Sequence, residues 1–301
     1  MRGYKPKITV VGSVNMDLVT ETNRFPGVGE TIMGETFKQF PGGKGANQAV
    51  AAARLGAEVS FIGCIGNDVF GKVLRQRLEQ EKINLDGLEI ISGEPTGIAQ
   101  ITVSNQENSI IVVPGANYKI SKKWIEKKRH LIENADMILL QLEIPIEIVS
   151  SVVDMAFEHK IPTILNPAPA QHLPKSLLNK ITYITPNESE LRLLTEGKGT
   201  DFVSKIDALL EAGIDSVIVT KGVNGVAYKG SCGEQVSYKD SLKVEAVDST
   251  GAGDTFNGAL AVAIGSQKPM EEAVEFAIKA AALSVTKFGA QSGMPYDHDM
   301  T

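Results

Sequence analysis

Short runs of β-branched and other apolar residues alternate along this chain with longer segments of amphipathic helical pattern. The runs that we expect to form buried strands are 8–12, 59–65, 137–142, 163–165, 182–184 and 216–220. The helical patterns between them, each long enough for a right-handed crossover between parallel strands, are 68–80, 122–133, 145–159 and 202–212. The alternation predicts a three-layer α/β fold, in which helices cover both faces of one mostly parallel sheet.

Two stretches interrupt this alternation and have the pattern of antiparallel strands. The stretch 17–40 is rich in Thr, Gly and Pro, and the stretch 97–113 has two apolar runs, 98–103 and 110–113, around a polar turn. Both follow expected strand ends, and ligands of open parallel sheets bind at the carboxyl ends of the strands. We therefore predict one domain over 1–301, in which these stretches form a small β-sheet lid above the site. The alternative is that the two stretches form a pair of ornamental hairpins, which have no role at the site.

The charge and hydropathy of the chain indicate which classes of partner it can bind. The chain has 30 Lys and Arg residues against 36 Asp and Glu, a net charge of −6, so a small molecule is a better expected partner than nucleic acid. No apolar stretch approaches the ~18 residues that cross a bilayer, and Asn15 and Asp17 end the first apolar run too early for a signal peptide. Cys64 and Cys232 lack the spacing of a metal site or a disulfide framework. We expect a cytoplasmic protein that binds neither nucleic acid nor membrane.

The segment 248–258 predicts an anion-binding site. It reads Asp-Ser-Thr-Gly-Ala-Gly-Asp-Thr-Phe-Asn-Gly and runs into a small-residue helix at 259–264. Glycines before a helix let the free N–H groups of its first turn point outward, and the helix dipole adds positive potential that suits a transferring phosphoryl group. Asp254 is either an N-terminal cap or a general base. An anion site gains nothing from a nearby carboxylate unless that group handles a proton or a cation, so Asp248 and Asp254 together favour chemistry.

Polar clusters also occur at other expected strand ends and helix starts. The segment 41–49, Pro-Gly-Gly-Lys-Gly-Ala-Asn-Gln-Ala, lacks the Walker A spacing and is either a site for a polyhydroxylated or phosphorylated ligand or a Gly-rich connection. Asn15 and Asp17 alternate onto one side at the end of the first strand, where they either receive adjacent sugar hydroxyls or terminate the strand. Gln-Leu-Glu at 141–143 ends a further strand.

The remaining motifs carry less information. Thr-Pro-Asn-Glu-Ser-Glu at 185–190 ends a strand before a helix, and Thr-Lys-Gly-Val-Asn-Gly at 220–225 has the shape of a hairpin turn. The four histidines show no metal-binding spacing. The sequence has no Gly-x-Ser-x-Gly elbow, and no Gly-x-Gly-x-x-Gly follows the first strand. These absences disfavour a hydrolase of the elbow type and a nicotinamide-dependent dehydrogenase.

Taken together, the motifs and their order resemble the ribokinase family of carbohydrate kinases, also called the PfkB family, over essentially the whole chain. The segment 248–256 is similar to the family's C-terminal motif and 42–49 to its N-terminal motif, and further similar segments are 166–170, 185–188 and 289–291. The resemblance implies phosphorylation of ribose at its 5-hydroxyl by ATP, with Mg²⁺ and an activating K⁺, in a homodimer formed through the lid. The alternatives are a kinase for deoxyribose, fructose or a nucleoside such as adenosine, and a non-catalytic sensor of sugar or nucleotide.

The resemblance also implies a role for each matching residue. Asp254 would be the base, and the anion hole would be Thr250, Gly251, Ala252 and Gly253. The sugar would lie among Asn15, Asp17, Gly43, Lys44, Asn47, Glu143 and Asp254. ATP would be bound by Asn187, Thr220, Gly222, Gly225 and Gly253, and Mg²⁺ would be arranged through water by Glu190. K⁺ would be held by Asp248 and Thr250 and by backbone oxygens of Ser284, Lys287 and Gly289.

Two positions depart from the family's pattern. Gly293 stands where these kinases often have a Ser that completes the cation site, which puts the affinity or selectivity for the cation in doubt. Ile278 stands where many relatives have a polar residue facing adenine, so the contact to the base is expected to be apolar there. Both departures leave the residues expected to carry the chemistry in place.

Overall fold

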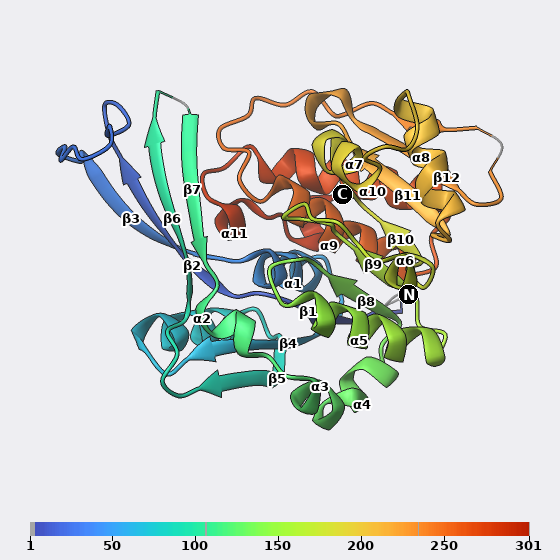
Figure 1. Cartoon of the computed structure of the whole chain (residues 1–301), viewed down its shortest axis with the longest axis horizontal. Helices are drawn as coiled ribbons and strands as arrows, with labels where there is room; N and C mark the ends of the chain where they lie inside the picture. The colour runs from blue at the N-terminus through green and yellow to red at the C-terminus, as the bar shows by residue number, and fades with distance from the viewer. Residues whose placement is uncertain (1–3, 106, 234, 301) are drawn as a thin grey trace.

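The computed structural model describes residues 4–105, 107–233 and 235–300, which form two sheets with helices around the larger one (Figure 1). Within these residues the large sheet has nine strands, in the order β13-β12-β11-β10-β9-β8-β1-β4-β5. Their bounds are Lys7–Val11 (β1), Glu58–Gly66 (β4), Asn84–Ile91 (β5), Met137–Leu140 (β8), Thr163–Leu165 (β9), Tyr183–Ile184 (β10), Ser216–Thr220 (β11), Val226–Gly230 (β12) and Ser237–Lys239 (β13). All neighbours from β5 to β11 pair in parallel, and only the β11–β12 and β12–β13 pairs are antiparallel. The predicted mostly parallel sheet is confirmed.

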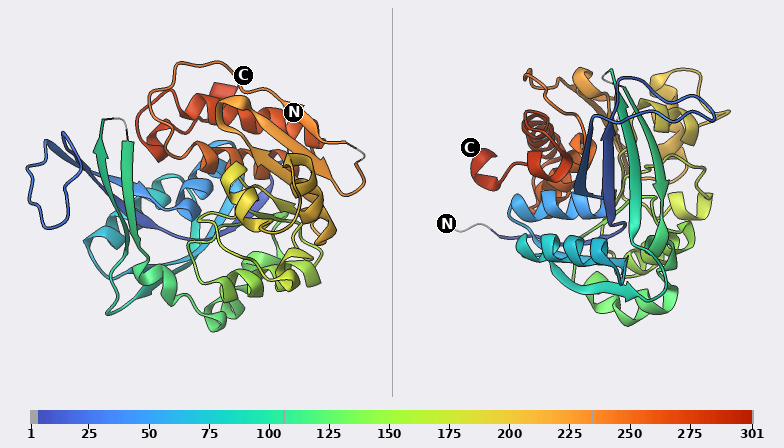
Figure 2. Two further views of the ribbon diagram at one scale, coloured as in Figure 1. Left: turned by 45° about the horizontal axis from the view of Figure 1, so that its top comes forward. Right: turned by 90° about the vertical axis from the view of Figure 1, so that its left-hand side faces the viewer.

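Helices cover both faces of this sheet, as Figure 2 shows. One face carries α1 (Lys44–Arg54), α2 (Val69–Gln80), α9 (Ala252–Gly265) and α10 (Met270–Ser284). The other face carries α3 (Lys122–Lys127), α4 (Arg129–Glu133), α5 (Ile146–Glu158), α6 (Lys175–Leu178), α7 (Glu188–Leu194) and α8 (Phe202–Glu211). Alternate residues of a strand face opposite sides, so β1 places Ile8 and Val10 in one core and Val11 in the other. None of the described helices is long and apolar enough to cross a membrane.

Short helical turns lie between these elements and after the last of them. They are α11 (Ala290–Gly293) and the 3₁₀ turns η1 (Gly115–Lys119), η2 (Gly222–Asn224) and η3 (Asp297–Met300). The connection between β11 and β12 contains η2, so the segment predicted to be a hairpin turn does join two antiparallel strands.

The small sheet is built from the two stretches that interrupt the α/β alternation, and it projects at the left of Figure 1. Its strands, in the order β3-β2-β6-β7, are β2 (Asn15–Glu21), β3 (Thr36–Gly42), β6 (Gly97–Ser104) and β7 (Glu107–Val113). The pairs β2–β3 and β6–β7 are antiparallel, and β2 pairs with β6 in parallel. The predicted second sheet is confirmed, whereas its action as a lid on a single domain remains a prediction.

One predicted strand end is wrong. Asn15 and Asp17 were expected at the end of the first strand, but β1 ends at Val11 and both residues lie in β2 of the small sheet. The chain leaves the large sheet at Gly12, where it passes so close to the end of β8 that a Cβ atom would lie 2.0 Å from Gln141 Oε1. The sequence does not reveal this break, because the residues on both sides of Gly12 are buried and no polar stretch separates the two strands.

Other elements differ in extent from their predictions. The helix expected over 122–133 is divided into α3 and α4 at Lys128, whose amide donates to the carbonyl groups of both Trp124 and Ile125 and so tightens the turn. The strands β5, β12 and β13 and the helix α10 were not predicted. The six predicted strands and the helices α2, α5 and α8 lie within two residues of their predicted ends.

Candidate active site

Asp254 lies in the first turn of α9, and its side chain is 7% exposed. The N-cap of this helix is Gly251, whose φ of 78° is in the left-handed region that glycine adopts without strain, and no side chain caps the helix. The N–H groups of a first helical turn have no partner within the helix. The Ala252 amide donates to the Ser249 carbonyl at 3.2 Å, which leaves the amides of Gly251 and Gly253 as candidate donors beside the Asp254 carboxylate. In this structure Asp254 is therefore not a helix cap.

Two amides from α1 hold the Asp254 carboxylate. Asn47 Nδ2 donates to Oδ2 at 2.9 Å, and Gln48 Nε2 donates to Oδ1 at 3.0 Å. The two helices approach closely because position 258 is glycine: a Cβ atom there would lie 2.7 Å from the Cβ of Ala51. Gly258 is one turn after Asp254, so this close contact brings the carboxylate within reach of both amides.

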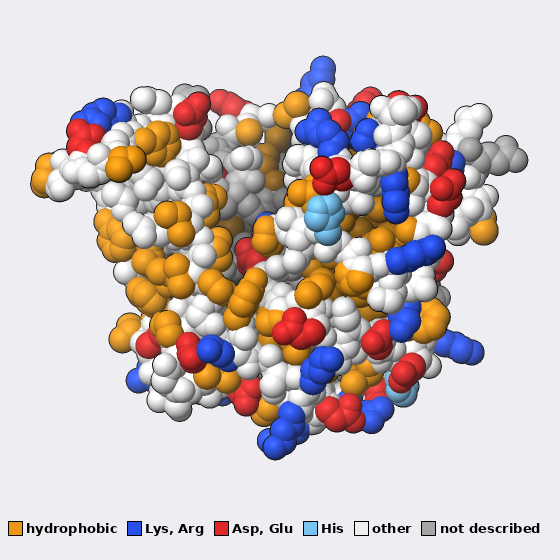
Figure 3. Space-filling model, in the orientation of Figure 1, with side chains coloured by type: hydrophobic (Ala, Val, Ile, Leu, Met, Phe, Trp, Pro, Cys, Tyr) orange, Lys and Arg blue, Asp and Glu red, His pale blue; other side chains and the backbone are white. Residues whose placement is uncertain are grey.

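Predicted sugar contacts gather on the side of Asp254 that is next to the small sheet. Glu143, which follows β8, accepts hydrogen bonds from Ser13 Oγ at 2.5 Å and from the backbone amide of Lys44 at 3.1 Å. Asn15 Nδ2 lies 3.5 Å from the same carboxylate oxygen of Glu143. The start of β2, the end of β8 and the start of α1 therefore meet at one point. Figure 3 shows that the surface is hollowed between the small sheet and the rest of the molecule.

Asp17 joins this group from β2. Its carboxylate lies against the backbone of β3, where a Cβ atom on Gly42 would be 2.2 Å from Asp17 Oδ2. Burial, together with the negative charges of Glu143 and Asp254, raises the pKa of Asp17 to about 7, against the opposing charge of Lys44. Asp17 is therefore poised between its neutral and ionised forms near neutral pH.

Lys44 begins α1 and brings positive charge to these carboxylates. Gly43 before it has a φ of 88°, and a Cβ atom there would lie 2.7 Å from the backbone nitrogen of Asn15, so only glycine fits this turn. Burial disfavours the charge on Lys44, but the carboxylates of Asp254 and Glu143 outweigh it and raise the pKa of the ammonium group. Lys44 therefore remains a cation throughout the physiological range.

A cavity of about 560 Å³ lies on the other side of Asp254. The predicted residues that line it are Thr220, Gly222, Gly225, Ala252, Gly253 and Ile278. Most of its other lining side chains are apolar, among them Phe256 and Val285. Ile278 is 7% exposed, so it offers the cavity an apolar contact.

Asn187 and Glu190 lie at the start of α7, beside this cavity. They form a capping box, in which Asn187 Oδ1 accepts from the Glu190 amide at 2.8 Å and Glu190 Oε2 accepts from the Asn187 amide at 2.8 Å. Asn187 is also bridged to Thr220 at the end of β11. Burial raises the pKa of Glu190, against the opposing charge of Lys44. Both residues thus have a structural role, and Glu190 is also within electrostatic range of Lys44.

The predicted cation ligands lie around the loop before α9. Asp248 Oδ1 accepts from the Thr250 amide at 2.9 Å, and its Oδ2 accepts from the Gly289 amide at 2.8 Å. Burial opposes ionisation of Asp248, but these hydrogen bonds outweigh it and hold its pKa below the usual value. Asp248 is thus ionised and ties the loop that precedes α9 to the segment that precedes α11.

Gly293 lies against two of the predicted cation-binding carbonyl groups. A Cβ atom at this position would be 2.4 Å from the Ser284 oxygen and 3.4 Å from the Lys287 oxygen. The Gly289 oxygen accepts a hydrogen bond from the Gly293 amide at 3.0 Å. The backbone as it stands therefore has no room for a serine side chain at 293. Across the described residues, no three His, Cys, Asp or Glu side chains converge to hold a metal ion, so backbone, water or substrate oxygens must complete any such site.

Several contacts of this site involve residues that the sequence did not single out. Asn117 in η1 donates from Nδ2 to Asn15 Oδ1 at 2.8 Å and accepts from the Val14 amide at 2.9 Å. Ser13 and Gln48 were missed as well, although each is next to or near a predicted residue. Ser13 and Gln48 could have been found, because each is a polar residue close in sequence to a predicted contact. Nothing in its local sequence marks Asn117, which is 102 positions from Asn15.

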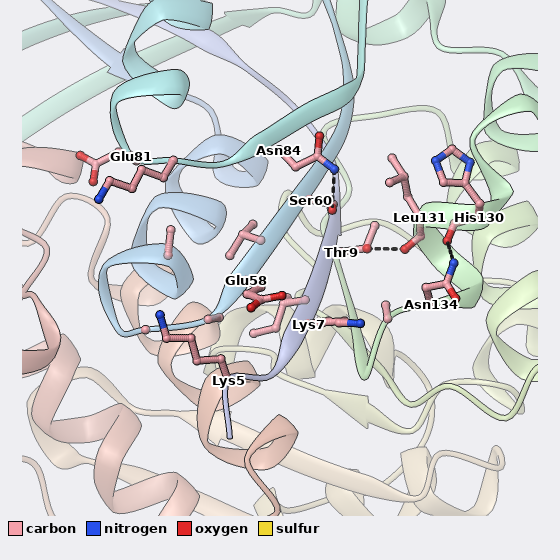
Figure 4. Close-up of a pocket in the computed structure, with 17 residues that line it drawn as sticks. Lys5, Lys7, Thr9, Glu58, Ser60, Glu81, Asn84, His130, Leu131 and Asn134 are labelled. Carbon is pink, nitrogen blue, oxygen red and sulfur yellow. Dashed lines mark hydrogen bonds between the residues drawn. The ribbon is translucent and has the colours of Figure 1, made fainter. Parts of the chain in front are cut away.

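A second cavity, of about 620 Å³, lies at the opposite, amino-terminal end of β1 and β4 (Figure 4). It contains none of the predicted site residues. Thr9 Oγ1 donates to the Leu131 carbonyl at 2.6 Å, and Asn84 Nδ2 donates to Ser60 Oγ at 3.3 Å. Figure 4 shows the Lys5 and Lys7 side chains pointing away from each other. Its polar groups therefore bond to neighbours or diverge, and we assign this cavity no function.

Comparison with known proteins gives a likeness over nearly the whole chain. Residues 5–297 match the family described as pfkB family carbohydrate kinase. A ribokinase from Bacillus subtilis (strain 168) is 44% identical over 288 residues, which are 96% of each chain. A deoxyribokinase from Salmonella typhi is 37% identical over 294 residues, which cover 96% of this chain and 95% of the relative. The structure of Arabidopsis thaliana ribokinase complexed with ribose and ATP matches with a TM-score of 0.91 at 35% identity, over 99% of this chain and 98% of the other.

Proposed function

This chain belongs to the pfkB family of carbohydrate kinases, and we propose that it transfers the γ-phosphoryl group of ATP to the 5-hydroxyl of ribose. The observation that carries the proposal is the position of Asp254. It is buried in the first turn of α9, with carboxylates and amides on one side and a largely apolar cavity on the other. The similar ribokinases, one of them complexed with ribose and ATP, support the same pair of substrates.

The polar side of Asp254 suits a sugar. Carboxylates accept hydrogen bonds only, so Asp17 and Glu143 pair with hydroxyl donors, while the amides of Asn15 and Asn47 both donate and accept. Gly43 lets the backbone approach the ligand at the start of α1. The small sheet closes over the bound sugar as a lid and keeps out water, which would otherwise accept the phosphoryl group in its place.

The chemical step needs alignment, charge neutralisation and a proton acceptor. Asp254 takes the proton of the sugar hydroxyl as that oxygen attacks phosphorus. The anion hole from Thr250 to Gly253, at the positive end of the α9 dipole, stabilises the negative charge on the transferring group through those of its N–H groups that are not already bonded to Asp248 and Ser249. Lys44, held as a cation by its acidic neighbours, adds further positive charge.

ATP binds in the cavity on the other side, along Thr220, Gly222, Gly225 and Gly253, with Asn187 next to the phosphates. Glu190 would help to hold Mg²⁺ through water, and the bound metal would supply positive charge for the phosphates. Mg²⁺ usually keeps several waters and takes the rest of its ligands from substrate phosphates, which agrees with the lack of a converging acidic cluster in the described chain.

K⁺ is the proposed activator, held by Asp248, Thr250 and the carbonyl groups of Ser284, Lys287 and Gly289. The oxygens of Ser284 and Lys287 both come close to Gly293, and Asp248 is ionised, so the donors have the right chemistry. Gly293 removes the side-chain ligand that such kinases often have there. We therefore expect potassium to raise turnover by shaping the loop before α9, and equal turnover in potassium and in a bulky organic cation buffer would remove the claim.

We also propose a homodimer formed through the small sheet. Its strand β7 is exposed along its whole length and includes four adjacent apolar residues, from Ile110 to Val113, of which Ile111 is 63% exposed. A long apolar strand at a sheet edge is a surface for pairing with another chain. Light scattering on the purified protein measures the mass directly, and a monomer at all working concentrations would exclude this dimer.

The function is tested by ATP consumption with pentoses, hexoses and nucleosides, each with and without potassium. Ribose is expected to give the highest catalytic efficiency. Deoxyribose is the second candidate, because a deoxyribokinase is among the similar proteins. A clear preference for deoxyribose, fructose or adenosine would replace the ribose assignment and keep the kinase, whereas no ATP consumption with any of them would overturn the kinase itself.

A further inference from the structure

Buried amides form two hydrogen-bonded chains that end on Asp254. In the first, Gln141 Nε2 donates to Gln48 Oε1 at 2.6 Å, and Gln48 Nε2 donates to Asp254 Oδ1 at 3.0 Å. In the second, Gln291 Nε2 donates to Asn47 Oδ1 at 3.1 Å, and Asn47 Nδ2 donates to Asp254 Oδ2 at 2.9 Å. Each oxygen of the carboxylate is therefore the last acceptor of one chain.

All four amides point in the same direction, and the carboxylate is the reason. An ionised carboxylate only accepts, so the amide beside it must present its NH₂ group, and its oxygen then faces the amide behind. Hydrogen bonds aligned in this way polarise one another. The far ends are Gln141 Oε1 and Gln291 Oε1, which are buried and accept no hydrogen bond from any described residue. Both chains thus satisfy the acceptors of Asp254 and leave the oxygen at their own outer end without a donor among the described residues.

Gln48 has the most contacts in these chains. Its side chain is fully buried, and its Nε2 also donates to Asn166 Oδ1 at 3.2 Å, beyond the end of β9. Gln48 therefore connects α1 to the residues that follow two strands of the large sheet, Gln141 and Asn166, and to the start of α9. Rotation of its amide would break hydrogen bonds to all three partners at once.

We propose that Gln48 is a positioning residue for the phosphoryl transfer. It fixes the rotation of the Asp254 carboxylate, so that the lone pairs not used by Gln48 and Asn47 face the sugar hydroxyl. The inference rests on the proposed function, in which Asp254 is the base. Gln141 is one hydrogen bond further from Asp254 and acts through Gln48, because it sets the orientation of the Gln48 amide.

The test replaces each amide by a side chain of similar length that cannot donate. Gln48→Met and Gln141→Met are made in the wild-type background and again together with Asp254→Asn. We expect Gln48→Met to lower kcat by about 10- to 100-fold, since a small misplacement of a reacting group has effects of this order. The KM for ribose is expected to stay within about threefold, because Gln48 does not touch the sugar. Gln141→Met is expected to show a smaller loss of the same kind.

The double variants separate positioning from packing. A residue that acts through Asp254 has no further effect once Asp254 is Asn, so Gln48→Met with Asp254→Asn should turn over as slowly as Asp254→Asn alone. The inference would be overturned if the two single-variant losses of kcat multiply in the double variant, or if folded Gln48→Met keeps the wild-type kcat. In either case phosphorylation of ribose by the wild-type protein would still support the proposed function. If Gln48→Met does not fold, Gln141→Met decides: a lower kcat at unchanged Tm supports the positioning role, and an unchanged kcat overturns it.

Discussion

The two sides of Asp254 are built in opposite ways. The side that we propose for the sugar consists of polar side chains that are buried or half-buried, namely Asn15, Asp17, Asn47 and Glu143, and of these Asn15 bonds to Glu143 while Asn47 bonds to Asp254. The side that we propose for the nucleotide is a cavity of about 560 Å³ whose predicted lining is largely backbone and apolar surface, and it includes Thr220, Gly222, Gly225 and Ile278. A site built to bond hydroxyls rejects a ligand that lacks one, whereas an apolar cavity discriminates weakly. We therefore expect substitutions to have large effects on the sugar side and small effects on the nucleotide side.

The largest effect is expected where the two sides meet. Asp254→Asn should lower turnover by about 10² to 10⁴, the range for loss of a general base, because the amide cannot accept the hydroxyl proton. Binding of ribose and ATP should remain close to that of the wild type. Steady-state kinetics with calorimetric binding measures both quantities. A purified variant that keeps more than a tenth of the wild-type turnover would show that Asp254 is not the base.

The second effect concerns the sugar side alone. An unpaired buried polar group loses roughly 1–3 kcal/mol, and more when it is charged. With Asp17 left unpaired, 2-deoxyribose should therefore be a poorer substrate than ribose by about tenfold or more in kcat/KM. Asp17→Ala should reduce kcat/KM for ribose far more than for deoxyribose, which brings the two sugars closer together. Comparable efficiencies of the wild-type protein on both sugars would contradict this assignment of Asp17.

Much of the sugar side was predictable, because its residues follow strands or begin helices that local patterns reveal. Lys44 begins α1 and Glu143 follows β8, and the structure brings both together with Asp17, although Asp17 lies within β2 and not at the predicted end of the first strand. The pairing of Asn117 with Asn15 was not predictable, since it depends on how β2 and η1 pack and not on either segment alone. The break between β1 and β2 was missed for a similar reason: Gly12 is required by its close approach to Gln141, a residue of another strand end.

On the nucleotide side, patterns indicated the glycines and turns but not how their side chains are used. Asn187 and Glu190 were predicted as ligand contacts, and the structure shows that they also cap α7. Both roles favour the same residue types at a helix start, so the sequence alone does not separate them. The amide chains that end on Asp254 were also missed, because a buried glutamine such as Gln48 looks like a surface residue in a sequence until the packing of α1 against α9 is known.

The third effect is a pH dependence of stability and of the KM for ribose, and we expect it to arise from Asp17 on the sugar side. The folded, ligand-free protein raises the pKa of Asp17 from 3.8 to about 7. Between these values the folded state holds a proton that the unfolded chain releases, so the contribution of Asp17 to stability is fully present below the lower value and is lost as the pH rises through about 7. Ribose hydroxyls pair better with the ionised form, so the KM for ribose should fall over the same range.

Asp17→Asn is the matched control for this pH dependence, because it keeps the shape and removes the titration. Tm of the ligand-free protein, measured from pH 5 to 8, should fall more steeply for the wild type than for the variant. The KM for ribose, measured over the same range, should depend on pH in the wild type and much less in Asp17→Asn. Parallel curves for the two proteins would assign the titration to another group.

The smallest effect is expected deep in the nucleotide side. Ile278 is 7% exposed and offers the cavity only apolar surface, so Ile278→Ala would remove apolar contact with the adenine that we propose to bind there, but no hydrogen bond. Loss of one methylene from an apolar pocket changes the binding free energy by roughly 1–3 kcal/mol. We expect the lower end of this range, because the cavity is open, so the KM for ATP should rise by about tenfold. The KM for ribose should not change, because Ile278 lies on the far side of Asp254 from the sugar. Initial rates at varied ATP and at varied ribose separate the two outcomes. A rise in the KM for ATP of about a hundredfold, or an equal rise for ribose, would show that the two sides are not as different as the structure indicates.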